Sequence, residues 1–164
     1  MKIKVPHVSH SKSDKHVSWS SHYSMGIKLI DDQHKGLIDF VNDLFNHSNG
    51  NEEEERAYFK DVIHVAVSYA KTHFATEEKY MLATKFQGYA EHKKAHDKFI
   101  LNVVHTVKDF DAGKRLVLEK FAYFLKDWIL CHVAGMDVLY AQYFKKILVL
   151  DADGKLRISV TDLK

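Results

Sequence analysis

The sequence predicts an all-α protein, an antiparallel four-helix bundle with up-down-up-down connections. Apolar side chains recur every three or four residues through four long segments, which is the period of amphipathic helices. The 164 residues include only seven glycines and one proline, so few positions would interrupt a long helix. The segments between the four periodic stretches are short, and short connections place successive helices side by side in opposite directions.

The composition is that of one globular domain with a sizeable core. The hydrophobic fraction of 46% is ordinary, and the formal charge of +2 argues against a broad nucleic-acid-binding surface. The single cysteine, Cys131, cannot form an internal disulfide and fits a reducing compartment. No apolar run reaches the length of a signal peptide or a membrane span. We therefore expect a cytoplasmic protein with neither a nucleic-acid nor a membrane partner.

The chain divides into three parts. Residues 1–18 are polar and aperiodic, so we expect a flexible N-terminal extension. Residues 19–146 hold the bundle, and they begin with an apolar segment from Trp19 to Ile27 that we expect to form an arm packed against the core. Residues 147–164 form a short C-terminal tail.

The first two helices are expected on either side of a loop at residues 46–51. Asp31 or Asp32 would cap the first helix, because short acidic side chains accept hydrogen bonds from the free backbone N–H groups there. The acidic run at residues 52–55 is expected to be exposed to solvent and to begin the second helix, where negative charge favours the helix dipole. That helix should end near Leu82.

The third helix is expected from about residue 89 to 110, and the fourth from about 114 to 146, with a turn at residues 111–113 between them. In the tail, two β-prone runs flank the turn signal Asp153-Gly154. This pattern is typical of a hairpin, although an extended tail is also compatible with it.

Two of the expected helices carry pairs of residues that bind metals. His73 and Glu77 are four residues apart, so they share one face of the second helix, and His92 and His96 do the same on the third. Twelve histidines in a chain of this length produce about one such histidine pair by chance. Either pair alone is therefore weak evidence for a metal site.

Three further candidates make the pattern more specific. His34 lies in the first helix, and His132 and Asp137 lie in the fourth. In an ideal helix Asp137 would point about 140° away from His132, so a local bend or wide turn is needed, and Gly135 between them would make it easier. All these residues lie on or beside apolar helix faces, where a carboxylate is costly to bury unless it is paired or bound to a metal. The sequence thus predicts cations inside the bundle.

The same segments resemble the hemerythrin-like family, and most of all its single-domain bacterial members. The resemblance covers about residues 19–146. The matching motifs are DDQH at 31–34, HFATEEKYM at 73–81, HKKAH at 92–96 and WILCHVAGMDVLY at 128–140. The resemblance implies a four-helix bundle and seven metal ligands, which are His34, His73, Glu77, His92, His96, His132 and Asp137.

The resemblance also implies two iron ions (Fe2+ or Fe3+) joined by an oxo or hydroxo bridge. The last three histidines would hold one iron and the first two the other, while both carboxylates would bridge the pair. One coordination position then remains open on the iron of His34 and His73, where O2, nitric oxide or a small anion such as azide would bind. An apolar pocket around it would be lined by Leu37, Phe74, Trp128, Ile129 and Tyr140, although ordinary core packing accounts for each of them equally well.

The function implied by the resemblance is reversible O2 binding for carriage, storage or delivery, without catalysis. The donor set favours this role, because neutral imidazoles stabilise high oxidation states of iron poorly, whereas di-iron oxygenases use carboxylate-rich sets. Two alternatives remain open. One is a di-iron enzyme or a nitric-oxide-responsive protein, with peroxidase-, ferroxidase- or iron–sulfur-repair-like activity. The other is an O2 sensor that acts through an unidentified protein partner.

Overall fold

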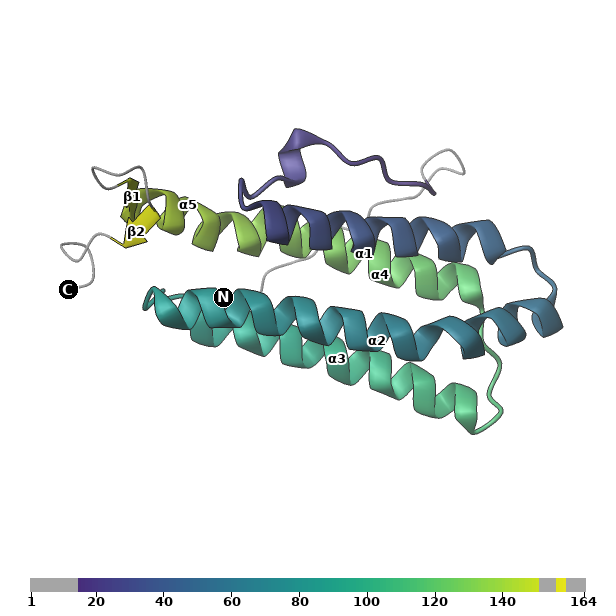
Figure 1. Ribbon diagram of the computed structural model, residues 1–164. Coiled ribbons are helices and arrows are strands. Elements are labelled where there is room, and N and C mark those ends of the chain that lie inside the picture. Colours follow the sequence, from purple (N-terminus) through teal and green to yellow (C-terminus); the bar gives the residue numbers. More distant parts are fainter. Residues whose placement is uncertain (1–14, 151–155, 159–164) are drawn as a thin grey trace.

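The predicted antiparallel four-helix bundle is confirmed (Figure 1). A computed structural model describes residues 15–150 and 156–158. The first three long helices are α1 (Lys28–His47), α2 (Glu52–Ala83) and α3 (Tyr89–Asp111). The fourth helical segment consists of α4 (Leu118–His132), the π-helix η3 (Val133–Asp137) and α5 (Val138–Ile147). Helix α1 packs against α2 and α4, and α2 packs against α3.

The arm before α1 is fastened to the bundle by polar contacts. The side chain of Asn42 accepts a hydrogen bond from the Val17 N–H and donates one to the Val17 carbonyl, each at 2.8 Å. Lys15 Nζ lies 2.6 Å from Glu119 Oε1 on α4. The arm therefore contacts the bundle from Lys15 onward, whereas the sequence placed its start at Trp19. The contacts before Trp19 include the pairing of Asn42 with the backbone of Val17 and the ion pair of Lys15. Residues 1–14, which make up most of the expected flexible extension, lie outside the described residues.

Helix α1 begins at Lys28, so the predicted start at Asp31 or Asp32 is wrong. Asp31 lies within the first turn, where its Oδ1 accepts a hydrogen bond from the Met25 N–H at 2.7 Å and its Oδ2 accepts one from the Ser24 hydroxyl at 2.6 Å. Both donors follow the short 3₁₀-helix η2 (Ser21–Tyr23). The carboxylate binds back to the arm instead of capping the helix, and it fixes the point where the arm enters α1.

The expectation that the whole acidic run at 52–55 is exposed is wrong at one residue. Glu55 is buried, and its two oxygens accept hydrogen bonds from two backbone N–H groups, that of Gly50 at 2.8 Å and that of Leu118 at 3.3 Å. Gly50 belongs to the loop between α1 and α2, whereas Leu118 is the first residue of α4. The Glu55 carboxylate therefore joins two connections that are distant in the sequence.

The fourth segment begins at Leu118 and not near the predicted Lys114. The guanidinium of Arg56 donates hydrogen bonds to the carbonyls of Lys114 at 3.0 Å and Phe110 at 3.3 Å. These contacts hold the connection against α2, and Val117 keeps an extended backbone. The helix therefore begins after this connection, at Leu118.

After α5 the chain forms a short antiparallel pair of strands, β1 (Leu148–Leu150) and β2 (Leu156–Ile158). Leu148 is opposite Ile158, and Leu150 is opposite Leu156. The pairing confirms the hairpin interpretation of the tail. The turn signal at residues 153–154 lies outside the described residues.

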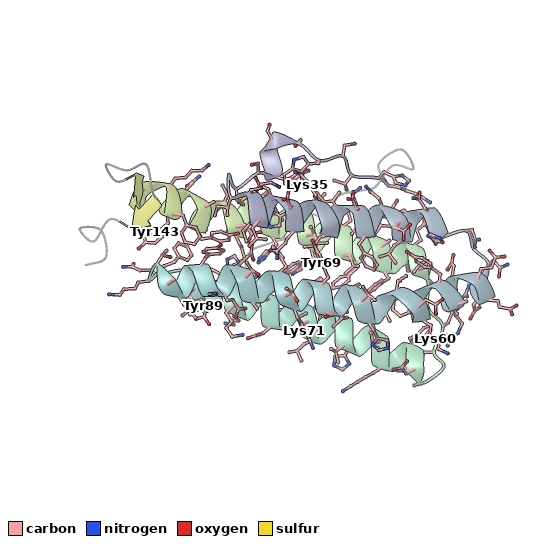
Figure 2. The ribbon with its side chains drawn as sticks, in the orientation of Figure 1. Lys35, Lys60, Tyr69, Lys71, Tyr89 and Tyr143 are labelled. Carbon is pink, nitrogen blue, oxygen red and sulfur yellow. The ribbon has the colours of Figure 1, made fainter. Side chains whose placement is uncertain are left out.

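One half of the bundle interior is apolar, whereas the other, called the polar half here, contains buried polar groups among apolar side chains such as Met81 and Phe144, and side chains fill the space between the helical segments (Figure 2). Near the loop between α1 and α2, the ring of Phe59 lies 4.8 Å from that of Phe110 and 5.3 Å from that of Phe121, between centroids. The other half contains a cluster of buried histidines and carboxylates. Among the described helices, none is long and apolar enough to cross a membrane.

Replacing Glu55 with alanine should lower the free energy of unfolding by about 1–3 kcal/mol, because the N–H groups of Gly50 and Leu118 lose their acceptor. Urea unfolding followed by circular dichroism measures this change. Glu53→Ala removes an exposed carboxylate from the same helical turn and should change stability by less than about 0.5 kcal/mol. Equal losses for the two variants would contradict the role assigned to Glu55.

Candidate metal centre

All seven predicted ligand side chains meet in the polar half of the bundle, and all four helical segments contribute. Each side chain belongs to a residue that is exposed by 5% or less. Helix α1 provides His34, α2 provides His73 and Glu77, α3 provides His92 and His96, and the fourth segment provides His132 and Asp137. The antiparallel topology accounts for this meeting, because it brings the beginning of α1 and α3 beside the end of α2 and α4.

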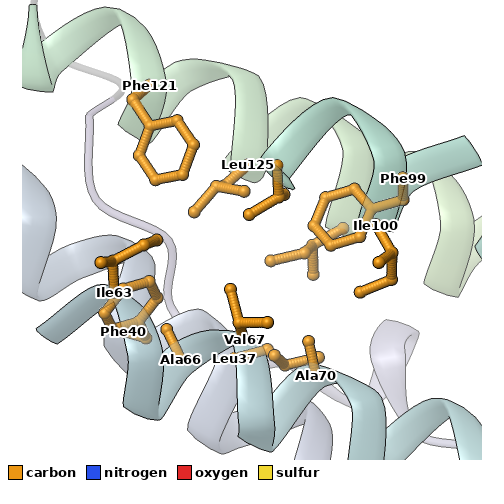
Figure 3. Close-up of a pocket in the computed structure, with 12 residues that line it drawn as sticks. Leu37, Phe40, Ile63, Ala66, Val67, Ala70, Phe99, Ile100, Phe121 and Leu125 are labelled. Atoms are coloured by element: carbon orange, nitrogen blue, oxygen red, sulfur yellow. The ribbon is translucent and has the colours of Figure 1, made fainter. Parts of the chain in front are cut away.

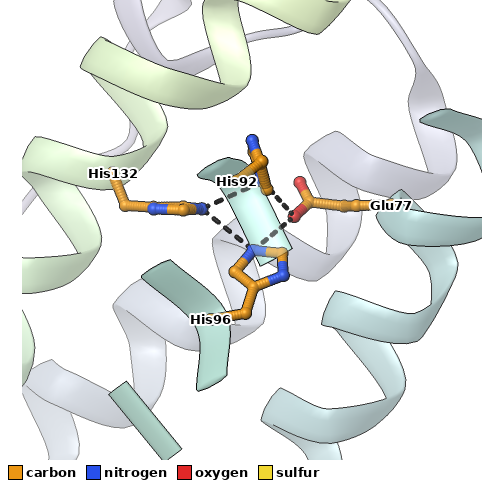
Figure 4. A group of neighbouring side chains, drawn as sticks. All are labelled: Glu77, His92, His96 and His132. Carbon is orange, nitrogen blue, oxygen red and sulfur yellow. Dashed lines mark hydrogen bonds and ion pairs between the residues drawn. The ribbon is translucent and has the colours of Figure 1, made fainter. Parts of the chain in front are cut away.

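Three histidines and one carboxylate form the first group (Figure 4). The Nε2 atom of His132 lies 3.0 Å from that of His96 and 3.2 Å from that of His92. Glu77 Oε2 lies 3.3 Å from His96 Nε2 and 3.5 Å from His92 Nε2. A shared proton satisfies only one pair of these nitrogens, whereas a cation at their meeting point satisfies all three.

The second group consists of His34, His73, Glu77 and Asp137. His34 Nε2 lies 3.2 Å from Asp137 Oδ2 and 3.6 Å from Glu77 Oε1. His73 Nε2 also lies 3.6 Å from Glu77 Oε1. Within each of the two groups, the atoms that would bind a metal all lie within 4.8 Å of one another.

Both carboxylates face the two groups at once, with a different oxygen toward each. Glu77 directs Oε1 toward His34 and Oε2 toward His92. Asp137 directs Oδ2 toward His34, while its Oδ1 lies 3.3 Å from His92 Nε2 and 3.1 Å from His132 Nε2. Carboxylates in this position can bridge two adjacent cations, so the geometry suits a pair of ions.

Several polar atoms of the cluster are buried without any hydrogen-bond partner in the described chain. They are both ring nitrogens of His34, Oε2 of Glu77 and both oxygens of Asp137. Leaving a buried polar group unsatisfied costs about 1–3 kcal/mol, and more when the group is charged. Cations held by the two groups would satisfy all of these atoms except His34 Nδ1, because the Nε2 atom of that ring is the one that faces the carboxylates. The donor set of imidazoles and carboxylates also suits divalent transition metals such as iron, so the residues fit a metal pair.

The pKa values of His34 and His73 shift in opposite directions within the cluster. Burial by itself lowers the pKa of His34, but the facing carboxylates of Asp137 and Glu77 outweigh it and raise this pKa to about 9. Burial lowers the pKa of His73 to about 4. Although burial raises the pKa of Glu77, the neighbouring histidines hold it well below its usual value. The cluster therefore keeps negative charge at its centre, where a bound cation would be stabilised.

The wide turn predicted between His132 and Asp137 is the π-helix η3, which begins directly after His132 and ends at Asp137. A π-helix bonds residue i to residue i+5 and so brings residues five apart to one side. Gly135, which was expected to ease this turn, is exposed, and a Cβ built there meets no atom within 4 Å. The turn therefore does not require the absence of a side chain at this position.

Three further side chains contact the cluster. Gln33 Oε1 lies 3.1 Å from His73 Nδ1, and Glu78 Oε1 lies 3.1 Å from His96 Nδ1. Sequence analysis missed Gln33 and Glu78, because each precedes or follows one candidate ligand in the chain but contacts a different one. The Tyr140 hydroxyl donates a 2.5 Å hydrogen bond to Glu77 Oε1, so this expected pocket residue also orients a carboxylate.

The other four pocket candidates either stack on the metal-binding histidines or line a cavity in the adjoining apolar half. Phe74 stacks on His96 with ring centroids 3.8 Å apart, and Trp128 stacks on His132 at 4.3 Å. Leu37 and Ile129 line a cavity of about 30 Å³ in the adjoining apolar half (Figure 3). All the side chains that line this cavity are apolar, so it suits a small apolar molecule better than water.

Comparisons with known proteins agree with this arrangement. A family profile described as "Hemerythrin HHE cation binding domain" matches residues 25–144. The bacteriohemerythrin of Pseudomonas aeruginosa PAO1 is 33% identical over 125 residues, which cover 76% of this chain and 79% of the relative. A hemerythrin from Sipunculus nudus is 28% identical, with 76% and 90% coverage. A structure titled "Crystal structure of hemerythrin:wild-type" has a TM-score of 0.68 and 29% identity, and the match covers 77% of this chain and 95% of that one.

Replacing Gly135 with alanine should raise the free energy of unfolding by about 0.5–1 kcal/mol, because alanine loses less conformational freedom in a helical segment. Urea unfolding checks the stability, and metal analysis should find an unchanged metal content. The reverse change at the neighbouring position, Ala134→Gly, should lower stability by a similar amount. A Gly135→Ala variant with lower stability and less metal would show that the π-helix needs glycine.

Adding Fe2+ without oxygen to the metal-free protein should raise its melting temperature, because the ions bind the folded state alone and relieve the unpaired buried atoms. At about 100 times the Kd each bound ion contributes about 2.7 kcal/mol, which corresponds to about 5–10 °C per ion for a chain of this size. Differential scanning calorimetry measures the shift. Glu77→Ala removes a donor from both groups and should abolish most of it, and an undiminished shift would place the metal elsewhere.

Proposed function

The chain belongs to the hemerythrin HHE cation-binding family, and from this premise we propose that it binds two iron ions and, at that centre, O2 reversibly. The physiological role would be carriage, storage or delivery of oxygen. One observation carries this proposal. The two carboxylates lie between a group of three histidines and a group of two, and each carboxylate faces both groups.

We assign His92, His96 and His132 to one iron and His34 and His73 to the other, with both carboxylates shared. When bound, the iron pair supplies two electrons to O2 and recovers them when O2 leaves. Because the two groups share the same carboxylates, the group with two histidines offers one donor fewer. We therefore place the position for an exogenous ligand at the His34 and His73 side.

The surrounding side chains keep water away and hold the donors in place. Phe74 and Trp128 cover His96 and His132 with stacked rings, and exclusion of water protects a reduced centre from side reactions. Burial raises the pKa of Tyr140 well above its usual value, so its hydroxyl stays protonated and continues to donate to Glu77. Such outer contacts fix the orientation of metal ligands.

For the O2 pocket we retain the five residues that the family resemblance suggests. Two of them, Leu37 and Ile129, line the apolar cavity of the apolar half, which supports a place for a small apolar molecule beside the centre. Phe74, Trp128 and Tyr140 contact metal-binding side chains, namely His96, His132 and Glu77 respectively. The same space would admit nitric oxide.

We prefer an oxygen carrier to an enzyme because five of the seven donors would be neutral imidazoles when iron is bound, and neutral imidazoles stabilise high oxidation states of iron poorly. Carboxylate-rich sets serve the di-iron enzymes that activate O2. The two roles differ in one property that can be measured, which is whether O2 leaves the protein unchanged.

Protein loaded with Fe2+ under anaerobic conditions should contain two irons per chain, one for each group of donors. Exposure to O2 should produce a visible charge-transfer band, and purging with argon should remove it. Absorption spectra and metal analysis follow both events. Rapid and permanent conversion to the ferric form would favour an enzyme, and an iron content well below two per chain would contradict the di-iron centre.

The variant His73→Ala should lose a ligand of the O2-binding iron while the group of His92, His96 and His132 remains intact. We expect the O2-dependent band to fall at least tenfold and one iron to remain. Tenfold is the lower end of the loss in metal affinity or activity when even a residue that only contacts a metal ligand is mutated. His64→Ala removes an exposed histidine from the same helix and should bind O2 normally. Normal O2 binding by His73→Ala would refute the assignment of this site.

A further inference from the structure

The histidines of the two metal groups differ in what their outer nitrogens contact. The Nε2 atoms of His73 and His96 face the centre, so the Nδ1 atoms carry the proton and donate outward. Both donate at 3.1 Å, His73 to the amide oxygen of Gln33 and His96 to the carboxylate of Glu78. The two contacts have the same length but differ by one negative charge on the acceptor.

The other histidine of the smaller group adds to this difference. Within the described chain, His34 Nδ1 has no hydrogen-bond partner. The outer nitrogens of His34 and His73 therefore meet no carboxylate, whereas one histidine of the larger group does.

Both outer partners are held in place. The backbone carbonyl of Gln33 accepts a hydrogen bond from Tyr69 at 3.1 Å, and its amide nitrogen lies 3.5 Å from the hydroxyl of Thr76, which fits the orientation that turns its oxygen to His73. The Glu78 side chain is exposed by only 18%, and its second oxygen lies 3.7 Å from Lys93 Nζ. Neither contact depends on a freely moving surface group.

A carboxylate that accepts the Nδ1 proton makes the imidazole a stronger electron donor through Nε2, and this stabilises a more highly charged metal ion. Hydrogen bonds to a charged acceptor are also roughly twice as strong as those to a neutral one. Because His96 is buried and Glu78 is only partly exposed, solvent screens the charge of Glu78 less than that of a surface carboxylate.

We propose that Gln33 and Glu78 are positioning residues that make the two irons electronically unequal. Glu78 stabilises the ferric state of the iron at His92, His96 and His132, while the neutral Gln33 leaves the iron at His34 and His73 easier to keep ferrous. When an external one-electron acceptor oxidises the diferrous protein, the first electron leaves the three-histidine iron. The iron with the open position is oxidised second. This inference rests on the di-iron centre proposed above.

Two isosteric substitutions test the charge without removing the hydrogen bond. Glu78→Gln makes the larger group neutral, and Gln33→Glu gives the smaller group the missing charge. Anaerobic spectroelectrochemical titration of the iron-loaded protein, with one-electron mediators, measures the two midpoint potentials. Glu78→Gln should raise the lower potential and Gln33→Glu should lower the higher one. We expect each change to be about tenfold in the ferric-to-ferrous ratio, or about 59 mV for one electron, so each variant narrows the gap.

Glu91→Gln is the matched control. It removes one carboxylate from an exposed position next to His92 in the chain, without a contact to a ligand nitrogen among the hydrogen bonds of the described residues, and it should leave both potentials nearly unchanged. A purely structural role for Glu78 predicts no shift in Glu78→Gln beyond that of Glu91→Gln, and this result would overturn the proposal. If Glu78→Gln loses iron, Gln33→Glu alone decides, because an unchanged higher potential contradicts the inference.

Iron content and the O2-dependent band, measured first on the unaltered protein, distinguish a failure of the proposed function from a failure of this inference. Fewer than two irons would refute the proposed function and this inference together, whereas two irons without a reversible band would refute reversible O2 binding alone and leave the two potentials to test the inference. Two irons and a reversible band, combined with potentials that neither substitution moves, would refute the inference alone.

Discussion

Two carboxylates buried among five histidines are the constraint on which the rest of this structure depends. Glu77 and Asp137 are fully buried, and burying a charge is costly unless opposite charge or hydrogen-bond donors surround it. No single helix can supply that environment. The carboxylates therefore require all four helical segments to meet at one place, and they require the π-helix that turns Asp137 inward.

One half of the bundle mainly stabilises the fold, and the other half contains the candidate metal centre. The apolar half, with its packed aromatic rings around Phe59, buries apolar surface that favours folding. The polar half contains buried atoms that have no partner within the described chain. Proteins tolerate such violations of good packing mainly at functional sites, where a stable remainder compensates for them.

Polar contacts at the helix ends keep the four segments in register, so that the ligands meet. Asp31 ties the arm to the first turn of α1, only three residues from His34 in the sequence. At the opposite end, Glu55 and Arg56 join the start of α2 to the connection between α3 and α4. A shift of any segment along its axis would separate the donor atoms, so these distant contacts support the site.

The sequence by itself determined the four helices, the seven candidate ligands and the need for a wide turn before Asp137, because helical periodicity specifies which side chains share a face. It did not determine how facing helices meet. It did not predict that Glu55 is buried or which way each carboxylate oxygen points. Nor did it predict that Gln33 contacts His73, 40 positions away, or that Glu78 contacts His96 on another helix. Only the tertiary structure decided these features, because they depend on how the packed helices are rotated and positioned along their axes. The spacing of residues along the sequence does not specify this rotation and position.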